Sequence, residues 1–265
     1  MGSYRGASSE ALVLISTPWV APLLTSGGPL KKRVLGVNAV FHDPASALVV
    51  DGRTVAAAEE ERFTRRKHGK VPVAFSTWEL PQRSALWCLE YADLSAEQLD
   101  AVAYSYDPRL APPRSDDVTA DTWESLRTLY VERAPLFLKT ALPGLDPGVV
   151  RFVPHHVAHA ASAYLAAPFR DCAVLVLDGR GESASHLAGH VRDGELKVLA
   201  AQRLPHSLGI VYETLTEHLG FTRASDEYKV MALASYGRPA FLDELREAVK
   251  TSGDGGFRAE PLPWE

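Results

Sequence analysis

The stretch of sequence that decides the fold is Cys172-Ala-Val-Leu-Val-Leu-Asp-Gly-Arg-Gly-Glu182. Its apolar run predicts a buried strand, which ends at Asp178 and is followed by a glycine-rich turn. Earlier in the chain, Val34-Leu-Gly-Val-Asn-Ala-Val-Phe41 predicts a comparable buried strand. Two regions of the chain therefore begin with the same kind of element, a buried strand.

The elements that follow these two strands also occur in the same order. Strand, loop, strand, Asp-Gly turn, strand and helices are predicted from residues 34–59 onward and again from residues 172–204 onward. No repeat of the sequence itself accompanies this duplication. The pattern predicts an α/β fold of the actin-like ATPase type, with duplicated ribonuclease H-like lobes whose glycine turns offer N–H groups to an anion. An ordinary hairpin turn is the alternative explanation of an isolated Asp-Gly-x-Gly run.

The predicted lobes divide the chain into three parts. Residues 1–30 are expected to form a disordered or mis-started extension, and residues 31–150 the first lobe, with a helical insertion near 107–150. Residues 151–265 are expected to form a partial second lobe that carries the candidate metal site. The chain stops after a predicted helix at about 239–250 and a polar tail, so the second lobe is predicted to be truncated.

Composition limits the classes of function. The chain has 265 residues, of which 46% are hydrophobic and 23% charged, as in ordinary globular proteins. A net charge of −5 gives no general attraction to nucleic acid or to an anionic membrane. Cys88 and Cys172 lie in apolar segments, which favours free thiols and a cytoplasmic location. The apolar residues 11–24 are too short to span a bilayer, and no clear cleavage site follows them.

Two histidines suggest a metal site. His155 and His159 lie four residues apart in an Ala-rich segment that predicts a helix, so both imidazoles share one helix face. His156 is expected to point about 100° away from them. With the strand-end carboxylate of Asp178, the pair predicts a two-histidine, one-carboxylate site for Fe(II) or Zn(II) that keeps open positions. Two partly buried histidines that only pack the helix are the alternative.

Two further pairs of residues are explained either by a role in binding or by simple exposure to solvent. Lys67 and His68 follow three arginines, so the segment is either a lid that brings cations to a phosphate or a solvated basic loop. Glu227 and Lys229 are either part of a binding pocket or an exposed pair on a helix.

Five segments together resemble the nodulation-U-type O-carbamoyltransferases, which modify antibiotics, lipo-oligosaccharides and similar hydroxylated natural products. They occur in the right order over about residues 33–237. The segments are Leu35-Gly-Val-Asn-Ala-Val-Phe-His-Asp-Pro-Ala-Ser-Ala47, Glu59-Glu-Glu-Arg-Phe-Thr-Arg-Arg-Lys-His68, Pro154-His-His-Val-Ala-His159, Leu177-Asp-Gly-Arg-Gly-Glu182 and Asp226-Glu-Tyr-Lys-Val-Met-Ala-Leu-Ala234.

The resemblance implies a reaction in two stages. ATP and carbamoyl phosphate give carbamoyl-adenylate in a YrdC-like domain, and an actin-like domain, similar to the tRNA threonylcarbamoyl-transfer proteins, passes the carbamoyl group to a hydroxyl. The metal ligands would be His155, His159 and Asp178, and His42 and Asp43 would face the carbamoyl group as catalytic residues. The residues near the adenylate would be Lys67, His68, Gly179, Gly181, Glu227 and Lys229.

The chain departs from the family in its length. Family members continue beyond this length, where they supply a further carboxylate and the YrdC-like domain that uses Mg(II). The resemblance therefore implies a partner chain with the remaining parts, a hydroxylated small-molecule acceptor, and no activity of this chain alone. A catalytically incomplete remnant or binding module that keeps the fold and the metal is the alternative. An unrelated actin-like kinase is disfavoured, since it has no need of the His-x-x-x-His helix.

Overall fold

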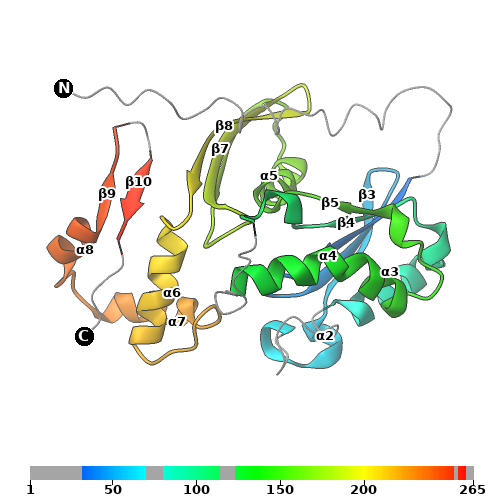
Figure 1. Ribbon diagram of the computed structural model, residues 1–265, viewed down its shortest axis with the longest axis horizontal. Helices are drawn as coiled ribbons and strands as arrows, with labels where there is room; N and C mark the ends of the chain where they lie inside the picture. The colour runs from blue at the N-terminus through cyan, green and yellow to red at the C-terminus, as the bar shows by residue number, and fades with distance from the viewer. Residues whose placement is uncertain (1–31, 70–79, 114–122, 254–255, 261–265) are drawn as a thin grey trace.

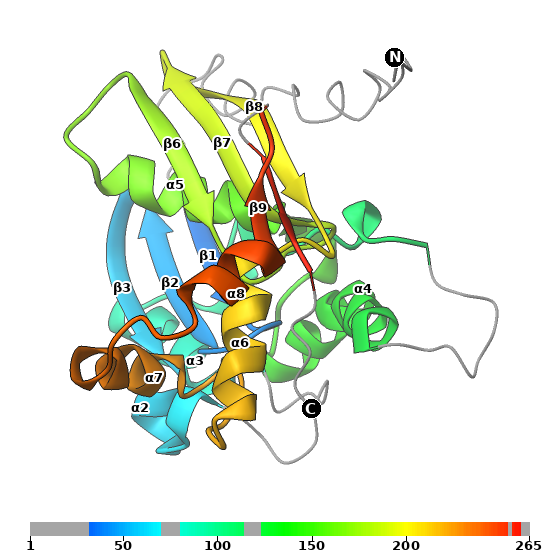
Figure 2. The ribbon, with the colours of Figure 1, turned by 90° about the vertical axis from the view of Figure 1, so that its left-hand side faces the viewer.

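The computed structural model describes residues 32–69, 80–113, 123–253 and 256–260 (Figure 1). The predicted extension at residues 1–30 lies outside the described residues. The described chain contains two main sheets, and the helix that carries the histidine pair lies between them (Figure 2).

The first sheet has five strands in the order β3-β2-β1-β4-β5. β2 is antiparallel to both β3 and β1, and β4 and β5 run parallel to β1. At the tip of the first hairpin, Asp51 and Gly52 both have positive φ, which suits the tight two-residue turn that the sequence predicts. The strands are β1 (Arg33–Asn38), β2 (Ala45–Val50), β3 (Arg53–Glu59), β4 (Ala101–Tyr104) and β5 (Val150–Phe152).

One face of this sheet packs against two helices, α3 (Gln82–Tyr91) and α4 (Trp123–Ala141). Alternation along β1 buries Leu35 and Val37 on that face. The sequence predicts helical stretches at about residues 123–130 and 134–142, and α4 covers both in one helix because it continues through Pro135. Buried residues on both sides of the proline pack into the core, and this packing offsets the backbone hydrogen bond that proline cannot make.

The second sheet contains three antiparallel strands, β6 (Cys172–Leu177), β7 (Ala184–Arg192) and β8 (Glu195–Arg203). Its inner face packs against α5 (His155–Ala166), with Ala160 of the helix against Val174 and Val176. Three helices follow: α6 (Leu208–His218), α7 (Glu227–Leu233) and α8 (Leu242–Ala248).

Two local predictions are wrong. The end of the chain is not only a polar tail, because β9 (Val249–Thr251) and β10 (Phe257–Ala259) pair as a two-stranded ribbon directly after α8. The sequence also predicts that the charged segment 59–68 is mostly irregular, but this segment contains the short helix α2 (Glu61–Thr64) and part of a 3-10 turn, Lys67–Gly69. In both places, backbone pairing occurs where the sequence carries few apolar residues to reveal it.

The predicted α/β class is confirmed, and each main sheet contains the predicted run of three consecutive antiparallel strands, β1-β2-β3 and β6-β7-β8. Cys88 and Cys172 are both free. Among the described residues, no helix combines the length and the apolar character that crossing a membrane requires.

Candidate metal centre

Helix α5 brings the histidine pair to the carboxyl end of β6. Pro154 precedes the helix with φ −53°, close to the value that its ring imposes and that a helix entry needs. His155 is buried, and half of the His159 side chain is exposed. Asp178, the residue that follows β6, meets both rings, so the predicted helix face and the predicted strand end do converge.

The three predicted ligand atoms form a compact triangle. The Nε2 atoms of His155 and His159 are 3.1 Å apart, and the Asp178 Oδ2 lies 3.1 Å from the first and 3.7 Å from the second. Ligands of a tetrahedral zinc ion, bound at the usual distances, lie about 3.3 Å from one another. The donor atoms and their spacing therefore fit a divalent cation of the zinc or iron type.

Burial at this point also favours an ion. The Oδ2 of Asp178 is buried and makes no hydrogen bond of normal geometry within the described chain, although imidazole nitrogens lie close to it. Buried polar atoms are usually hydrogen-bonded or bound to metal. Two facing imidazole nitrogens beside such an oxygen form a set of lone pairs that a cation would satisfy.

His156 does not point away from the centre, so its predicted orientation is wrong. Its Nε2 lies 3.3 Å from the Asp178 Oδ2, and the residue is buried. The glycine turn after β6 explains this, because Gly181 passes so close that an added Cβ would lie 3.1 Å from the His156 ring. The turn covers the start of α5, and both neighbouring imidazoles reach the carboxylate from adjacent sides.

The charges of the site match the forms in which such residues bind metal. Burial alone would raise the pKa of Asp178, but the imidazoles of His155 and His156 outweigh it and hold that pKa far below its ordinary value. Burial lowers the pKa of His159, and the neighbouring His155 lowers it further. The carboxylate is therefore ionised and the exposed imidazole neutral near pH 7, as ligation requires.

A backbone carbonyl orients the buried histidine. The Nδ1 of His155 lies 3.0 Å from the Ser105 carbonyl oxygen, which can only accept a hydrogen bond. A proton is thereby placed on Nδ1, so that in the neutral imidazole Nε2 carries the lone pair that a metal would bind. Sequence patterns gave no sign of Ser105, since its contribution is a main-chain oxygen.

The predicted catalytic pair His42 and Asp43 forms a cluster beside this centre, and His68 joins it. The two Asp43 oxygens meet the Nδ1 atoms of His42 at 2.8 Å and His68 at 3.0 Å. Burial raises the pKa of Asp43, but its two histidine partners prevail and lower it. The neighbouring Phe41 ring lies 4.6 Å from the His155 ring, so the cluster adjoins the candidate metal centre.

The glycine turn is held tightly by its surroundings. The Gly179 N–H donates to the Asp178 carboxylate at 2.6 Å, and the Gly181 N–H donates to the Ala184 carbonyl at 2.7 Å. Both N–H groups are thus engaged within the turn. Gly209 at the start of α6 packs so closely that an added Cβ would lie 2.5 Å from the Gly179 Cα.

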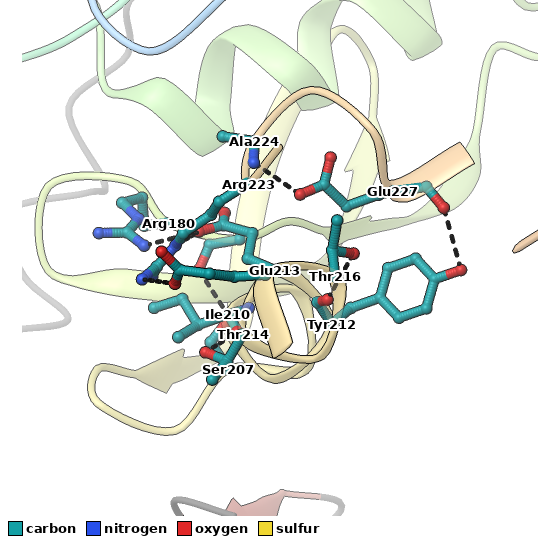
Figure 3. A network of polar contacts seen from close by, with 12 residues as sticks. Arg180, Ser207, Ile210, Tyr212, Glu213, Thr214, Thr216, Arg223, Ala224 and Glu227 are labelled. Carbon is teal, nitrogen blue, oxygen red and sulfur yellow. Dashed lines mark hydrogen bonds and ion pairs between the residues drawn. The ribbon is translucent and has the colours of Figure 1, made fainter. Parts of the chain in front are cut away.

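Ionic contacts extend from this turn to helices of both regions, and those with Glu213 are drawn in Figure 3. The Arg180 guanidinium lies 3.0 Å from Glu213 on α6 and 3.2 Å from Glu124 on α4. Arg223 approaches the same Glu213 oxygen at 3.1 Å. Arg180 therefore links the insertion of the first region to the helix that follows the second sheet.

Three predicted adenylate residues have other surroundings. The Glu227 carboxylate accepts from the Ala224 N–H at 2.6 Å (Figure 3), and Lys229 pairs with Asp226 at 2.7 Å. Lys67 is exposed. In the described chain, none of these three contacts the residues of the candidate metal centre, and their role with an adenylate stays a prediction.

Comparisons with known proteins agree with the motifs. The model of a family described as "Carbamoyltransferase N-terminus" matches residues 33–145 and 142–265. Nodulation protein NolNO of Sinorhizobium fredii is 35% identical over 235 residues, which are 83% of this chain and 32% of that protein. An uncharacterized protein of Synechocystis, sll1178, is 33% identical over 253 residues, 85% of this chain and 38% of that protein. This chain thus spans about a third of the length of these curated relatives.

Among solved structures, YeaZ from Pseudomonas aeruginosa matches at 15% identity with a TM-score of 0.38, over 65% of this chain and 68% of that one. The family match, in contrast, covers nearly all of the described residues, and the relatives align with most of the chain. The chain therefore belongs to the carbamoyltransferase N-terminus family.

Proposed function

We propose that this chain is the N-terminal portion of an O-carbamoyltransferase, which moves a carbamoyl group from carbamoyl-adenylate to a hydroxyl of a natural product or sugar. Family membership supports a transferase of carbamoyl groups. The observation that carries the proposal is the triangle of His155, His159 and Asp178 with the His42–Asp43–His68 cluster beside it.

The triangle would hold a divalent cation, Fe(II) or Zn(II), through His155 Nε2, His159 Nε2 and Asp178 Oδ2. Such an ion supplies Lewis acidity, which polarises a carbonyl oxygen near it. The chain's own contribution is to keep the His159 imidazole neutral and the Asp178 carboxylate charged, because burial and His155 lower the pKa of His159 and the neighbouring imidazoles lower that of Asp178.

His42 is proposed to take the proton of the acceptor hydroxyl. Asp43 accepts from its Nδ1, which leaves Nε2 free of a proton, and more than half of the His42 side chain is exposed to an incoming acceptor. The acceptor oxygen then bonds to the carbamoyl carbon, the bond from that carbon to the adenylate oxygen breaks, and AMP leaves. His68 supports this step by holding the second oxygen of Asp43.

The substrate contacts and partners rest on the motif resemblance. Lys67, Glu227 and Lys229 would reach the adenylate together with His68 and the glycine turn. ATP, carbamoyl phosphate and Mg(II) would be used by the remaining part of the protein, because this chain spans only about a third of its relatives. A cytoplasmic setting would provide these substrates.

The test is reconstitution. The chain would be co-purified with a protein that supplies the remaining two thirds, then given ATP, carbamoyl phosphate and a hydroxylated acceptor. The expected result is a carbamoylated acceptor seen by mass spectrometry, together with AMP. A His42→Gln variant should bind the same metal and form much less product, by about 10²–10⁴-fold.

The same experiment separates transfer from binding alone. No product from a complex that retains its metal would contradict carbamoyl transfer and would leave a metal-binding module as the function.

A further inference from the structure

Glu182 is a buried carboxylate that the proposed reaction does not use. It lies in the turn between β6 and β7 and is 6% exposed. Among the described residues it pairs with no basic side chain; its Oε1 instead accepts from two backbone N–H groups, His155 and Asp107, at 2.8 Å each. A buried carboxylate needs such partners, since burial without them is costly.

The first of these bonds caps the metal helix. The residue before α5 is Pro154, and no side chain of its own caps the helix. The first N–H groups of a helix lack partners within it, and negative charge is favoured there. Glu182 supplies both an acceptor and a charge at the N–H of His155, the first residue of the helix.

The second bond acts on the ring of the same histidine. Asp107 lies two residues after Ser105, on the loop that follows β4, and the Ser105 carbonyl is the group that faces the His155 Nδ1. By holding the N–H of Asp107, Glu182 fixes this loop against α5. One carboxylate oxygen therefore holds the backbone of His155 and, through the loop, the orientation of its imidazole.

We infer that Glu182 is a positioning residue for the candidate metal centre: its reach across the β6–β7 turn sets the place of His155 and hence the metal affinity. The inference rests on the proposed metal site. Close packing supports the inference. A Cβ added at Gly181, the neighbour of Glu182, would lie 3.4 Å from the Cβ of His155, so the turn has little room to move.

Reach and charge can be separated by two substitutions. Glu182→Gln keeps the length of the side chain and a carbonyl oxygen that can accept both N–H groups, but loses the charge. Glu182→Asp keeps the charge and is one methylene shorter, so it cannot reach both N–H groups. If Glu182 acts by positioning, Glu182→Asp should weaken metal binding and Glu182→Gln should not.

The experiment measures Zn²⁺ affinity by isothermal titration calorimetry for the wild-type chain and both variants, each checked for folding by circular dichroism. An exposed glutamate on β8 provides the control, Glu195→Asp. The expected result is a Glu182→Asp variant that binds Zn²⁺ about 10–100-fold more weakly, with Glu182→Gln and the control close to wild type.

Two results would overturn the inference while the metal site stands: wild-type affinity in Glu182→Asp, or weaker binding by Glu182→Gln than by Glu182→Asp. A wild-type chain that takes up no Zn²⁺ would overturn both the inference and the proposed metal site. If Glu182→Asp is unfolded, Glu182→Gln is compared with wild type instead. A marked loss of Zn²⁺ affinity in Glu182→Gln, which keeps the length of the side chain, would contradict positioning by reach.

Discussion

The first sheet and the second sheet differ in how much apolar surface they bury. The five-stranded sheet with α3 and α4 encloses a continuous core that includes Leu35, Leu48 and Val102, all 0% exposed. The three-stranded sheet buries mainly its face toward α5, while Leu175 and Leu177 on the other face of β6 are 65% and 66% exposed. The second region thus has much less burial to stabilise it.

The candidate metal centre lies where these two regions meet. Its ligands come from α5 and the end of β6, while Ser105 and Phe41, which contact His155, come from the first region. We infer that burial holds the first region together, and that polar contacts around Asp178, with a bound cation, hold the second region to it. Binding energy at a metal site contributes directly to folding.

The largest expected effect concerns the two apolar faces. Leu48→Ala should lower the free energy of unfolding by about 2–5 kcal/mol, because it empties a buried site. Leu175→Ala, on the exposed face, should change it by less than about 0.5 kcal/mol. Urea unfolding followed by circular dichroism measures both, and equal losses would contradict the contrast between the regions.

The next effect concerns the glycine turn. Gly209→Ala should destabilise the second region by about 1–3 kcal/mol, because its Cβ would meet the backbone of Gly179. Gly237→Ala is a matched control, since its Cβ meets nothing nearer than a carbonyl oxygen at 3.7 Å. Hydrogen exchange of the β6 and α6 amides measures the change. Protection equal to that of the Gly237→Ala control would show that the turn adjusts to the added Cβ without loss of stability.

A smaller effect is expected where Arg180 joins the regions. Its contacts with Glu124 and Glu213 are partly exposed, so Arg180→Met should cost no more than about 1 kcal/mol. Salt should reduce the difference from wild type, because it screens exposed charges. Thermal unfolding at low and high salt tests this, and a difference that salt leaves unchanged would argue for packing in place of charge.

The smallest effect is a pH dependence within the first region. The pKa of Asp43 is lowered in the folded state despite burial, which acts to raise it. The unfolded chain therefore binds this proton first, so the contribution of Asp43 is complete at neutral pH and is lost as pH falls below about 3.9, through its folded pKa. The free energy of unfolding of Asp43→Asn should fall less steeply over this pH range than that of wild type. Equal slopes for the two proteins would contradict a contribution of Asp43 and its histidine partners to the pH dependence.

Much of the architecture could be predicted from the sequence. Apolar runs and the two Asp-Gly turns indicated the strands of both sheets, and the i,i+4 spacing with the strand-end carboxylate indicated the ligand triangle. The five motifs in order indicated the family, which the comparisons show.

What could not be predicted depends on contacts distant in sequence. His156 faces Asp178 where Gly181 packs against its ring at the helix start, and Ser105 acts through a carbonyl that no residue type reveals. Glu182 was visible in the quoted stretch, but its partners lie 27 and 75 residues away. The terminal ribbon is held by backbone pairing between β9 and β10, which a polar sequence does not indicate.

Metal uptake tests the central claim most directly. His159 is the ligand to change, because half of its side chain is exposed and its loss should leave the core intact. Zn²⁺ titration should give about one bound ion for wild type and for His190→Ala, a histidine further along β7, and an affinity at least about tenfold weaker for His159→Ala. A wild-type chain without bound metal, or a His159→Ala variant with unchanged affinity, would contradict the assignment of His155, His159 and Asp178 as the metal centre.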